Sequence, residues 1–174
     1  MLASTCREIP WQEAAPLVAA QFPAGLFLNT YAESSMPNTM TIGWGGFVRF
    51  FEKQLFMVPV RKSRYTYDLL QKNDAFTVSV PREGMKAELT FAGTNSGRDL
   101  NKFQGHGLTA VPAQEVNVPI IKECGLHLEC KVLFTSDLKK ENVEKKMRAR
   151  WYTPHEDDMH TFFFGEILRC YYTN

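Results

Sequence analysis

The stretch from Pro37 to Thr66, PNTMTIGWGGFVRFFEKQLFMVPVRKSRYT, decides the fold and the ligand class expected of this chain. It places a turn of small residues, an aromatic-rich pair of strands and a basic loop with hydroxyl groups one after another. Glycine and short side chains at a turn let the backbone approach a ligand closely. The stretch therefore predicts a binding site for a flat molecule that carries a phosphate.

The basic loop at the end of this stretch is the first candidate binding element. Within six positions it presents Arg61, Lys62, Ser63, Arg64 and Thr66. Charged loops usually only solvate a surface. This loop follows a strand and opens a helix, however, where free N–H groups and the helix dipole favour an anion. Tyr65 and Tyr67 fit a core, an interface or stacking on a ligand.

A second polar loop, GTNSGRDLNK, runs from Gly93 to Lys102. One interpretation is structural, since Ser96 could cap a short helix with Asp99 three residues later. The other is a loop that contacts the same ligand. The sequence supports the two interpretations equally.

Composition bounds the remaining possibilities. A chain of 174 residues has the size of one domain, and we expect a single domain over residues 1–174. A net charge of +1 gives no overall field that would attract nucleic acid or an anionic membrane. The cysteines lack CxxC spacing, which argues against zinc and disulfides; they are Cys6, Cys124, Cys130 and Cys170. Without an apolar run of membrane-spanning length or a signal sequence, we expect a cytoplasmic protein.

The pattern of apolar residues indicates mostly strands. We expect them at residues 25–31, 39–47, 54–60, 75–80, 123–134 and 161–172, the first two forming a hairpin around the turn at 34–38. Helices are expected at 10–21, from Ser63 or Thr66 to Asn73, and as one turn at 100–103. The charged run 137–150 fits a helix or an exposed turn and strand. Six strands suit a small closed barrel, and its surplus of aromatic residues suggests a subunit interface.

The histidines form no catalytic constellation. They are dispersed, at His106, His127, His155 and His160, and no Ser/His/Asp or HxxxH spacing joins them. A metal patch around His155 and His160 is less favoured than a solvated turn. Reactive chemistry would then belong to a bound cofactor.

Four segments, in this order, carry a family resemblance: NTMTIGW at Asn38–Trp44, RKSRYTY at Arg61–Tyr67, SGRDLNKF at Ser96–Phe103 and HTFFFGEI at His160–Ile167. Together they resemble the flavin reductase-like, FMN-binding split-barrel family, and within it the flavoredoxin-like branch. The match spans most of the chain, and four motifs in order are fairly specific. The resemblance implies a mainly β, six-stranded Greek-key split barrel with short peripheral helices. It also implies a homodimer that holds FMN near the interface between subunits.

The resemblance assigns ligand contacts by position. The flavin ring would lie along Asn38, Met40, Thr41, Ile42, Gly43 and Trp44. The loop that holds the phosphate and ribityl chain would comprise Val60, Arg61, Lys62, Ser63, Arg64, Tyr65 and Thr66. From the second loop would come Ser96, Gly97 and Lys102. Two departures are Ala92, where relatives often carry a cysteine, and the open Gly43–Gly46 turn, where Trp44 could stack on the ring or shield it.

The leading hypothesis is an FMN-binding flavoprotein oxidoreductase, in which flavin N5 accepts a hydride from NAD(P)H and electrons pass to an acceptor. Such transfer needs no catalytic side chain; Arg61, Lys62 and Lys102 are the cations that could stabilise the reduced flavin. No GxGxxG fingerprint is present, so a nicotinamide donor would bind transiently. The alternative is a flavoredoxin-like FMN electron-transfer protein that a redox protein reduces, without nicotinamide activity. A weaker possibility is another cofactor, such as pyridoxamine phosphate or haem.

Overall fold

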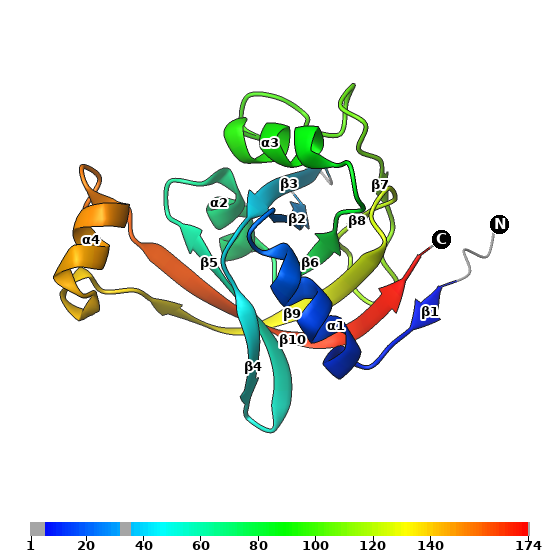
Figure 1. The fold of residues 1–174 in the computed structure, drawn as a ribbon, viewed down its shortest axis with the longest axis horizontal. Coiled ribbons are helices and arrows are strands. Elements are labelled where there is room, and N and C mark those ends of the chain that lie inside the picture. Colours follow the sequence, from blue (N-terminus) through cyan, green and yellow to red (C-terminus); the bar gives the residue numbers. More distant parts are fainter. Residues whose placement is uncertain (1–5, 32–35, 174) are drawn as a thin grey trace.

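The computed structural model describes residues 6–31 and 36–173. An eight-stranded antiparallel sheet has the order β3–β2–β6–β9–β10–β5–β4, with β1 added to β10, and β7 pairs with β8 separately (Figure 1). The strands of the sheet are β1 (Arg7–Glu8), β2 (Leu26–Tyr31), β3 (Pro37–Ile42), β4 (Gly46–Phe50), β5 (Lys53–Arg61), β6 (Ala75–Val80), β9 (Leu126–Asp137) and β10 (His160–Tyr172). The small sheet is β7 (Ala110–Val111) and β8 (Ile120–Ile121). The helices are α1 (Trp11–Gln21), α2 (Tyr65–Lys72), α3 (Lys86–Thr94) and α4 (Lys145–Tyr152), with a 3-10 turn at Lys140–Asn142.

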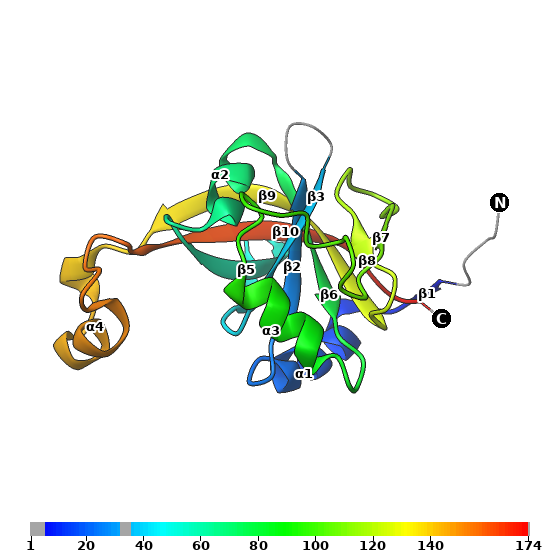
Figure 2. The same cartoon turned by 90° about the horizontal axis from the view of Figure 1, so that it is seen from above.

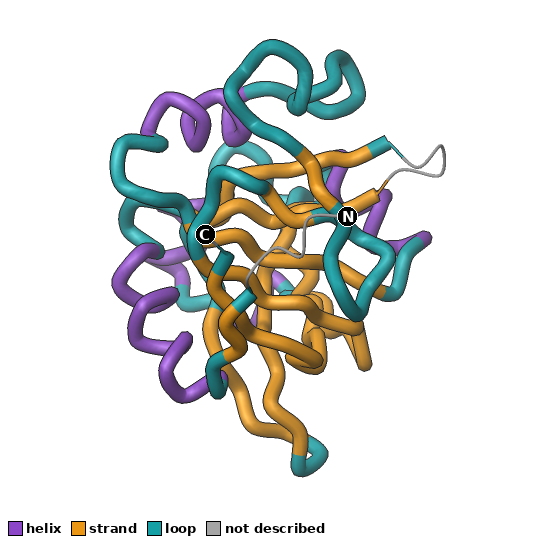
Figure 3. Tube along the Cα trace, turned by 90° about the vertical axis from the view of Figure 1, so that its right-hand side faces the viewer, coloured by secondary structure: helices purple, strands orange, loops and turns teal. Residues whose placement is uncertain are grey.

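The sheet curves around the core and the helices lie at its periphery (Figure 3). The central strands β2 and β6 are buried along nearly their whole length, because both of their faces are covered. A second, smaller core includes Phe27, Leu89 and Ile121, beneath α3. The prediction of a mainly β chain with short helices is confirmed.

β9 and β10 are the longest strands and carry α4 away from the body of the sheet (Figures 1 and 2). The first half of β9 is buried from Leu126 to Cys130, whereas from Lys131 onward most residues are at least partly exposed. The far halves of the two strands therefore form an arm that ends in α4.

The strand count differs from the prediction. The segment 39–47 is not one strand: β3 pairs with β2, and β4 pairs with β5. A Cβ at Gly45 would lie 2.9 Å from the carbonyl oxygen of Met57, so the crossing between β3 and β4 requires glycine. This division and β1 raise the count from six to eight. Among the described residues, no ladder joins β3 to β4, so the expected closed barrel is open there.

The predicted helices are partly confirmed. α1 lies where expected, and α2 begins at Tyr65, but neither Ser63 nor Thr66 caps it: Arg64 is the N-cap residue and makes no side-chain cap bond. α3 was not predicted, and residues 100–103 form turns rather than a helix. In the charged run, Glu144 caps α4 by accepting from the N–H groups of Lys146 and Met147. The hairpin of β2 and β3 is confirmed, but its expected turn at 34–38 is partly wrong, because Pro37 and Asn38 already pair with β2 as the start of β3. Residues 34 and 35 lie outside the described residues.

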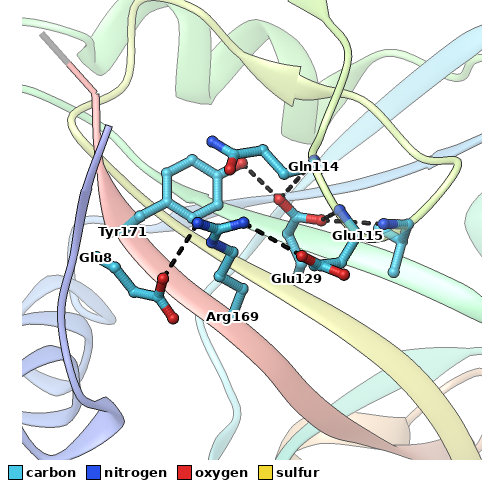
Figure 4. Close-up of polar contacts among 7 residues, drawn as sticks. Glu8, Gln114, Glu115, Glu129, Arg169 and Tyr171 are labelled. Atoms are coloured by element: carbon cyan, nitrogen blue, oxygen red, sulfur yellow. Dashed lines mark hydrogen bonds and ion pairs between the residues drawn. The ribbon is translucent and has the colours of Figure 1, made fainter. Parts of the chain in front are cut away.

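A buried carboxylate, Glu129 on β9, anchors the segment between β7 and β8 (Figure 4). It accepts hydrogen bonds from the N–H groups of Gln114, Glu115 and Val116 at 2.7–3.0 Å, and from the hydroxyl of Tyr171 at 2.6 Å. Nearby, Arg169 pairs with Glu8 at 3.1 Å and Glu115 at 3.2 Å. Both carboxylate oxygens of Glu129 are thus satisfied by the chain itself.

In the part of the chain that the structure describes, no helix has the length and apolarity needed to cross a membrane.

Candidate functional site

Two neighbouring cavities lie beside β3. The first has a volume of about 200 Å³ and lies where β3, the basic loop and the segment after α3 meet. Its lining comprises Asn38, Met40, Thr41, residues 63–66, residues 92–98 and Lys102. Three of these side chains are cations, Arg64, Arg98 and Lys102, and none of the described lining residues is a carboxylate. The first cavity therefore favours an anion.

Lys102 is the most deeply buried of these cations, with 4% of its surface exposed. Its ammonium donates to the carbonyl oxygens of Thr39 at 2.8 Å and Ala92 at 2.7 Å. An ammonium has three N–H groups, so these bonds leave one unused. Burial, and to a smaller degree the charge of Arg64, lowers the pKa of Lys102 to about 8. An anion in the cavity would offset the cost of this buried charge.

The other two cations differ in how they are held. Arg98 donates to the carboxylate of Asp68 at 2.5 Å and to the carbonyl oxygen of Ser63 at 3.1 Å, and its guanidinium lies 5.3 Å from the ring centre of Tyr65. Arg98 thereby ties the second loop to the basic loop. Arg64 is exposed, and its guanidinium makes no hydrogen bond or ion pair with any described residue, although its backbone N–H donates to the carbonyl oxygen of Arg61 at 3.0 Å. It is the cation most available to a ligand.

A buried acceptor and a glycine shape the inner wall of the first cavity. The amide of Asn38 donates to the hydroxyls of Thr30 and Thr66, both at 3.1 Å, while its Oδ1 is buried and has no hydrogen-bond partner among the described residues. A Cβ at Gly97 would lie 2.1 Å from this oxygen, so only glycine fits there. Gly97 therefore packs directly against this oxygen and closes the inner wall of the cavity.

The second cavity, of about 250 Å³, shares Met40, Thr41 and Arg64 with the first. The rest of its lining is Ile42, Gly43, Trp44, Pro59, Arg61, Trp151 and His160. Trp44 meets Trp151 edge to face with 4.9 Å between ring centres, and the ring of His160 lies 5.2 Å from that of Trp44. The cavity thus combines two indoles and an imidazole with the guanidinium groups of Arg61 and Arg64, a lining that suits a flat ring with polar edges.

Half of the basic loop already has carboxylate partners. The N–H and hydroxyl of Ser63 donate to the carboxylate of Asp158 at 2.9 and 2.8 Å, and Arg61 pairs with the same carboxylate at 3.6 Å. Burial raises the pKa of Asp158, but the bonds from Ser63 and the charge of Arg61 outweigh burial and hold it below its usual value. Lys62 pairs with Asp137 at 2.8 Å, and this hydrogen bond raises its pKa.

The structure thus brings together most of the residues expected to bind a ligand. The two cavities are lined by Asn38, Met40, Thr41, Ile42, Gly43, Trp44, Arg61, Ser63, Arg64, Tyr65, Thr66, Ser96, Gly97 and Lys102. Lys62 and Val60 line neither of these cavities, and Val60 is fully buried in the main core.

Sequence reasoning missed the contribution of the arm. Trp151, Tyr152 and Asp158 lie in or just after α4, and His160 begins β10. The metal patch around His155 and His160 is not formed, since no group of potential ligands gathers within residues 6–31 and 36–173. The available signal was the aromatic pair that ends the charged helix, followed eight residues later by the histidine of the fourth motif.

A family model described as "Flavin reductase like domain" matches residues 19–174. The chain belongs to this flavin reductase-like family. An uncharacterized protein of Archaeoglobus fulgidus is 36% identical over 132 residues, which cover 76% of this chain and 63% of that protein. The flavoredoxin of Desulfovibrio vulgaris (Miyazaki F) superposes with a TM-score of 0.66 and 27% identity, covering 84% of this chain and 67% of its own.

An FMN-binding domain of a flavin reductase-like enzyme from Shewanella baltica shares the fold over 99% of this chain and 80% of that chain, with a TM-score of 0.66 and 14% identity. The predicted family and split-barrel architecture are confirmed. The chain spans just under two thirds of the length of the Archaeoglobus relative.

Proposed function

We propose that this chain binds FMN across the two cavities and acts as a flavoprotein oxidoreductase that takes a hydride from NAD(P)H and passes electrons to an acceptor. The observation that carries the proposal is the junction of the cavities. A pocket with three cations and no carboxylate among its described lining residues lies beside a pocket that contains Trp44, Trp151 and His160, and Arg64 lines both. A flat ring that carries a phosphate matches this pairing, and membership of the flavin reductase-like family supports it.

The size of the site also supports a ligand that spans both cavities. Pockets for small molecules usually measure about 300–1,000 Å³, and each cavity alone is smaller than that. We place the phosphate in the first cavity, near Lys102 and near the guanidinium of Arg64, which has no partner among the described residues.

The ring would then lie in the second cavity, along Met40 to Trp44 and facing Trp151 and His160. Bound FMN supplies the group that accepts hydride and electrons, so the chain itself has to bind, orient and shield it. Of the three cations expected to stabilise a reduced ring, Arg61 lines this cavity, Lys102 lines the first and Lys62 lines neither. We therefore assign that electrostatic role to Arg61.

The alternative is an FMN electron-transfer protein that a redox partner reduces. The paired indoles of Trp44 and Trp151 favour it, because they stand at the second cavity where a nicotinamide would have to approach the ring. Both indoles remain about two-fifths exposed, which leaves a protein partner access to the cavity edge. The similarity to a flavoredoxin agrees with this reading.

We also propose a homodimer. A cluster of aromatic rings lies where the tip of the β4–β5 hairpin meets β9 and β10, and it comprises Phe50, Phe51, Phe134, Phe162 and Phe164. Phe51 is 64% exposed, and Phe134 stacks on Phe164 at 4.3 Å. Exposed aromatic clusters of this kind mark protein interfaces. Sedimentation of the protein and of Phe50→Ser tests this, since a monomer in both would contradict the dimer.

The function is tested by titrating the purified protein with FMN and with riboflavin, which lacks the phosphate. We expect FMN to bind with a bound-flavin spectrum and riboflavin to bind at least about tenfold more weakly. Stopped-flow mixing of the FMN-loaded protein with NADH or NADPH then separates the two candidates. Bleaching of the flavin band supports the reductase; its absence, with reduction by a redox protein, supports the electron carrier. Absence of FMN binding would contradict both.

A further inference from the structure

Tyr152 and His160 form a buried pair at the edge of the second cavity. The hydroxyl of Tyr152, the last residue of α4, lies 2.7 Å from Nδ1 of His160, the first residue of β10. Both residues are nearly inaccessible, with 5% and 7% of their surfaces exposed. No described residue hydrogen-bonds to the other ring nitrogen, Nε2. Since His160 lines the second cavity, its ring has one nitrogen bonded to Tyr152 and one available to a ligand.

The imidazole is neutral at pH 7. Burial lowers the pKa of His160 to about 4, with further lowering by Arg61 and Arg64, and Asp158 opposes this only in part. The remaining groups that contact the ring, Trp44 and Tyr152, are uncharged at that pH. A neutral imidazole carries one hydrogen, so one ring nitrogen donates and the other accepts.

The surroundings of Tyr152 decide which nitrogen accepts. Burial raises the pKa of its phenol, which therefore keeps its proton. Within the described residues, His160 is the only hydrogen-bond partner of the Tyr152 hydroxyl. If Nδ1 were the donor, the phenol hydrogen would be buried without an acceptor, which is the costlier arrangement. Donation from Tyr152 to Nδ1 satisfies both groups and leaves the imidazole hydrogen on Nε2.

Arg61 and Asp158 hold Tyr152 in place. The guanidinium of Arg61 lies 4.9 Å from the ring centre of Tyr152 and donates to the carbonyl oxygens of Trp151 at 2.5 Å and Asp158 at 3.3 Å. Asp158 is fixed in turn by Ser63. The end of α4, which stands on the projecting arm in Figure 1, is thus fastened to the end of β5.

We propose that Tyr152 fixes the proton of His160 on Nε2 and thereby makes His160 a hydrogen-bond donor to an acceptor atom of the flat ligand in the second cavity. Tyr152 is a positioning residue, because it acts through His160. Only the identity of the ligand rests on the proposed function; the proton position in the ligand-free protein does not.

The first test is NMR of ligand-free protein labelled with ¹⁵N in its histidines, with the His160 signals assigned by loss in His160→Gln. We expect an acceptor-type Nδ1 and a protonated Nε2. In Tyr152→Phe the Nδ1 signal should move, and the pKa of His160 should rise toward the ordinary 6.5, since the lost bond favoured the neutral form. The matched control, Tyr171→Phe, removes a buried hydroxyl bonded to Glu129 and should leave the His160 signals unchanged.

The second test uses FMN-loaded protein. Because the donor to the ring is no longer held, Tyr152→Phe should bind FMN about three- to tenfold more weakly and shift its midpoint potential, whereas Tyr171→Phe should change neither. A protonated Nδ1 in the wild-type protein, or unchanged His160 signals in Tyr152→Phe, would overturn the assignment of the proton. Unchanged affinity and potential would overturn the donor role. If FMN fails to bind at all but the NMR result is as expected, the proposed function fails while the Tyr152–His160 assignment stands.

Discussion

Glu129 and Lys102 are both charged, both buried and both bonded to backbone, yet their surroundings differ in kind. Each oxygen of Glu129 accepts two hydrogen bonds from the chain, three from N–H groups and one from Tyr171 in all. Among the described residues, Lys102 donates only to two carbonyl oxygens, which leaves one N–H, and no carboxylate lines its cavity. A buried charge that the chain satisfies completely stabilises the fold, whereas one left incomplete at a cavity indicates a ligand.

The largest effect on stability is expected at Glu129, because the chain itself supplies all the hydrogen bonds to this buried carboxylate. Glu129→Ala should lower the free energy of unfolding by about 3–5 kcal/mol, because three N–H groups and a hydroxyl lose their acceptor in a buried place. Urea unfolding measures this. Glu115→Gln, which removes only an exposed ion pair with Arg169, should cost about 1 kcal/mol or less. If both variants lost the same free energy of unfolding, Glu129 would contribute no more to stability than a surface carboxylate does.

Lys102→Met should change ligand affinity more than it changes stability. We expect FMN affinity to fall about 10- to 100-fold, because a charged donor to the phosphate is lost, while riboflavin affinity changes much less. Calorimetric titration of both ligands measures the difference. Lys62→Met is the matched control, since Lys62 lines neither cavity and pairs with Asp137. A similar loss for both flavins would mean that Lys102 only supports the backbone.

A smaller effect is expected from the exposed cation between the cavities. Arg64→Ala should weaken FMN binding about three- to tenfold and Lys62→Ala by less than twofold, because Arg64 lines both cavities without an ion pair among the described residues. Fluorescence titration at low and moderate salt measures both. Negligible losses from both variants would refute a phosphate site at this loop.

The smallest expected effect is on the pH dependence of stability and of FMN affinity, and it compares the two charges most sharply. Because the pKa of Lys102 is lowered from 10.5 to about 8, the unfolded chain binds more protons than the folded one between these values. The stability of the ligand-free protein should therefore rise with pH above about 8, relative to Lys102→Met. The ratio of FMN to riboflavin affinity should fall over the same interval, since the phosphate loses its ammonium partner. If the stability of the wild-type protein and of Lys102→Met changed with pH along parallel slopes, Lys102 would not carry the buried charge that is proposed to bind the phosphate.

Local pattern predicted much of this molecule. β5, β6, β10 and α1 lie within about two residues of their expected bounds, because alternation of apolar residues and a helix-terminating proline act over short distances. α3 was missed, since its apolar face is short and Gly93 lies near its end. The split of residues 39–47 was missed as well, because the close approach of Gly45 to Met57 joins positions that pattern cannot relate.

The sequence by itself determined the family, the mainly β fold and the two loops that meet at the first cavity, since these depend on local residue types and their order. Only the tertiary structure decided which loop cations pair with carboxylates of the chain and which remain available to a ligand. It pairs Arg61 and Lys62 with the chain's own carboxylates, leaves Arg64 without an ion pair within the described ranges, and buries Lys102. It also brings Trp151 and His160 to the second cavity, with Tyr152 hydrogen-bonded to His160. The pairing of β5, β9 and β10 joins residues about 75–100 positions apart, such as Lys62 with Asp137 and Ser63 with Asp158. No local pattern encodes such contacts.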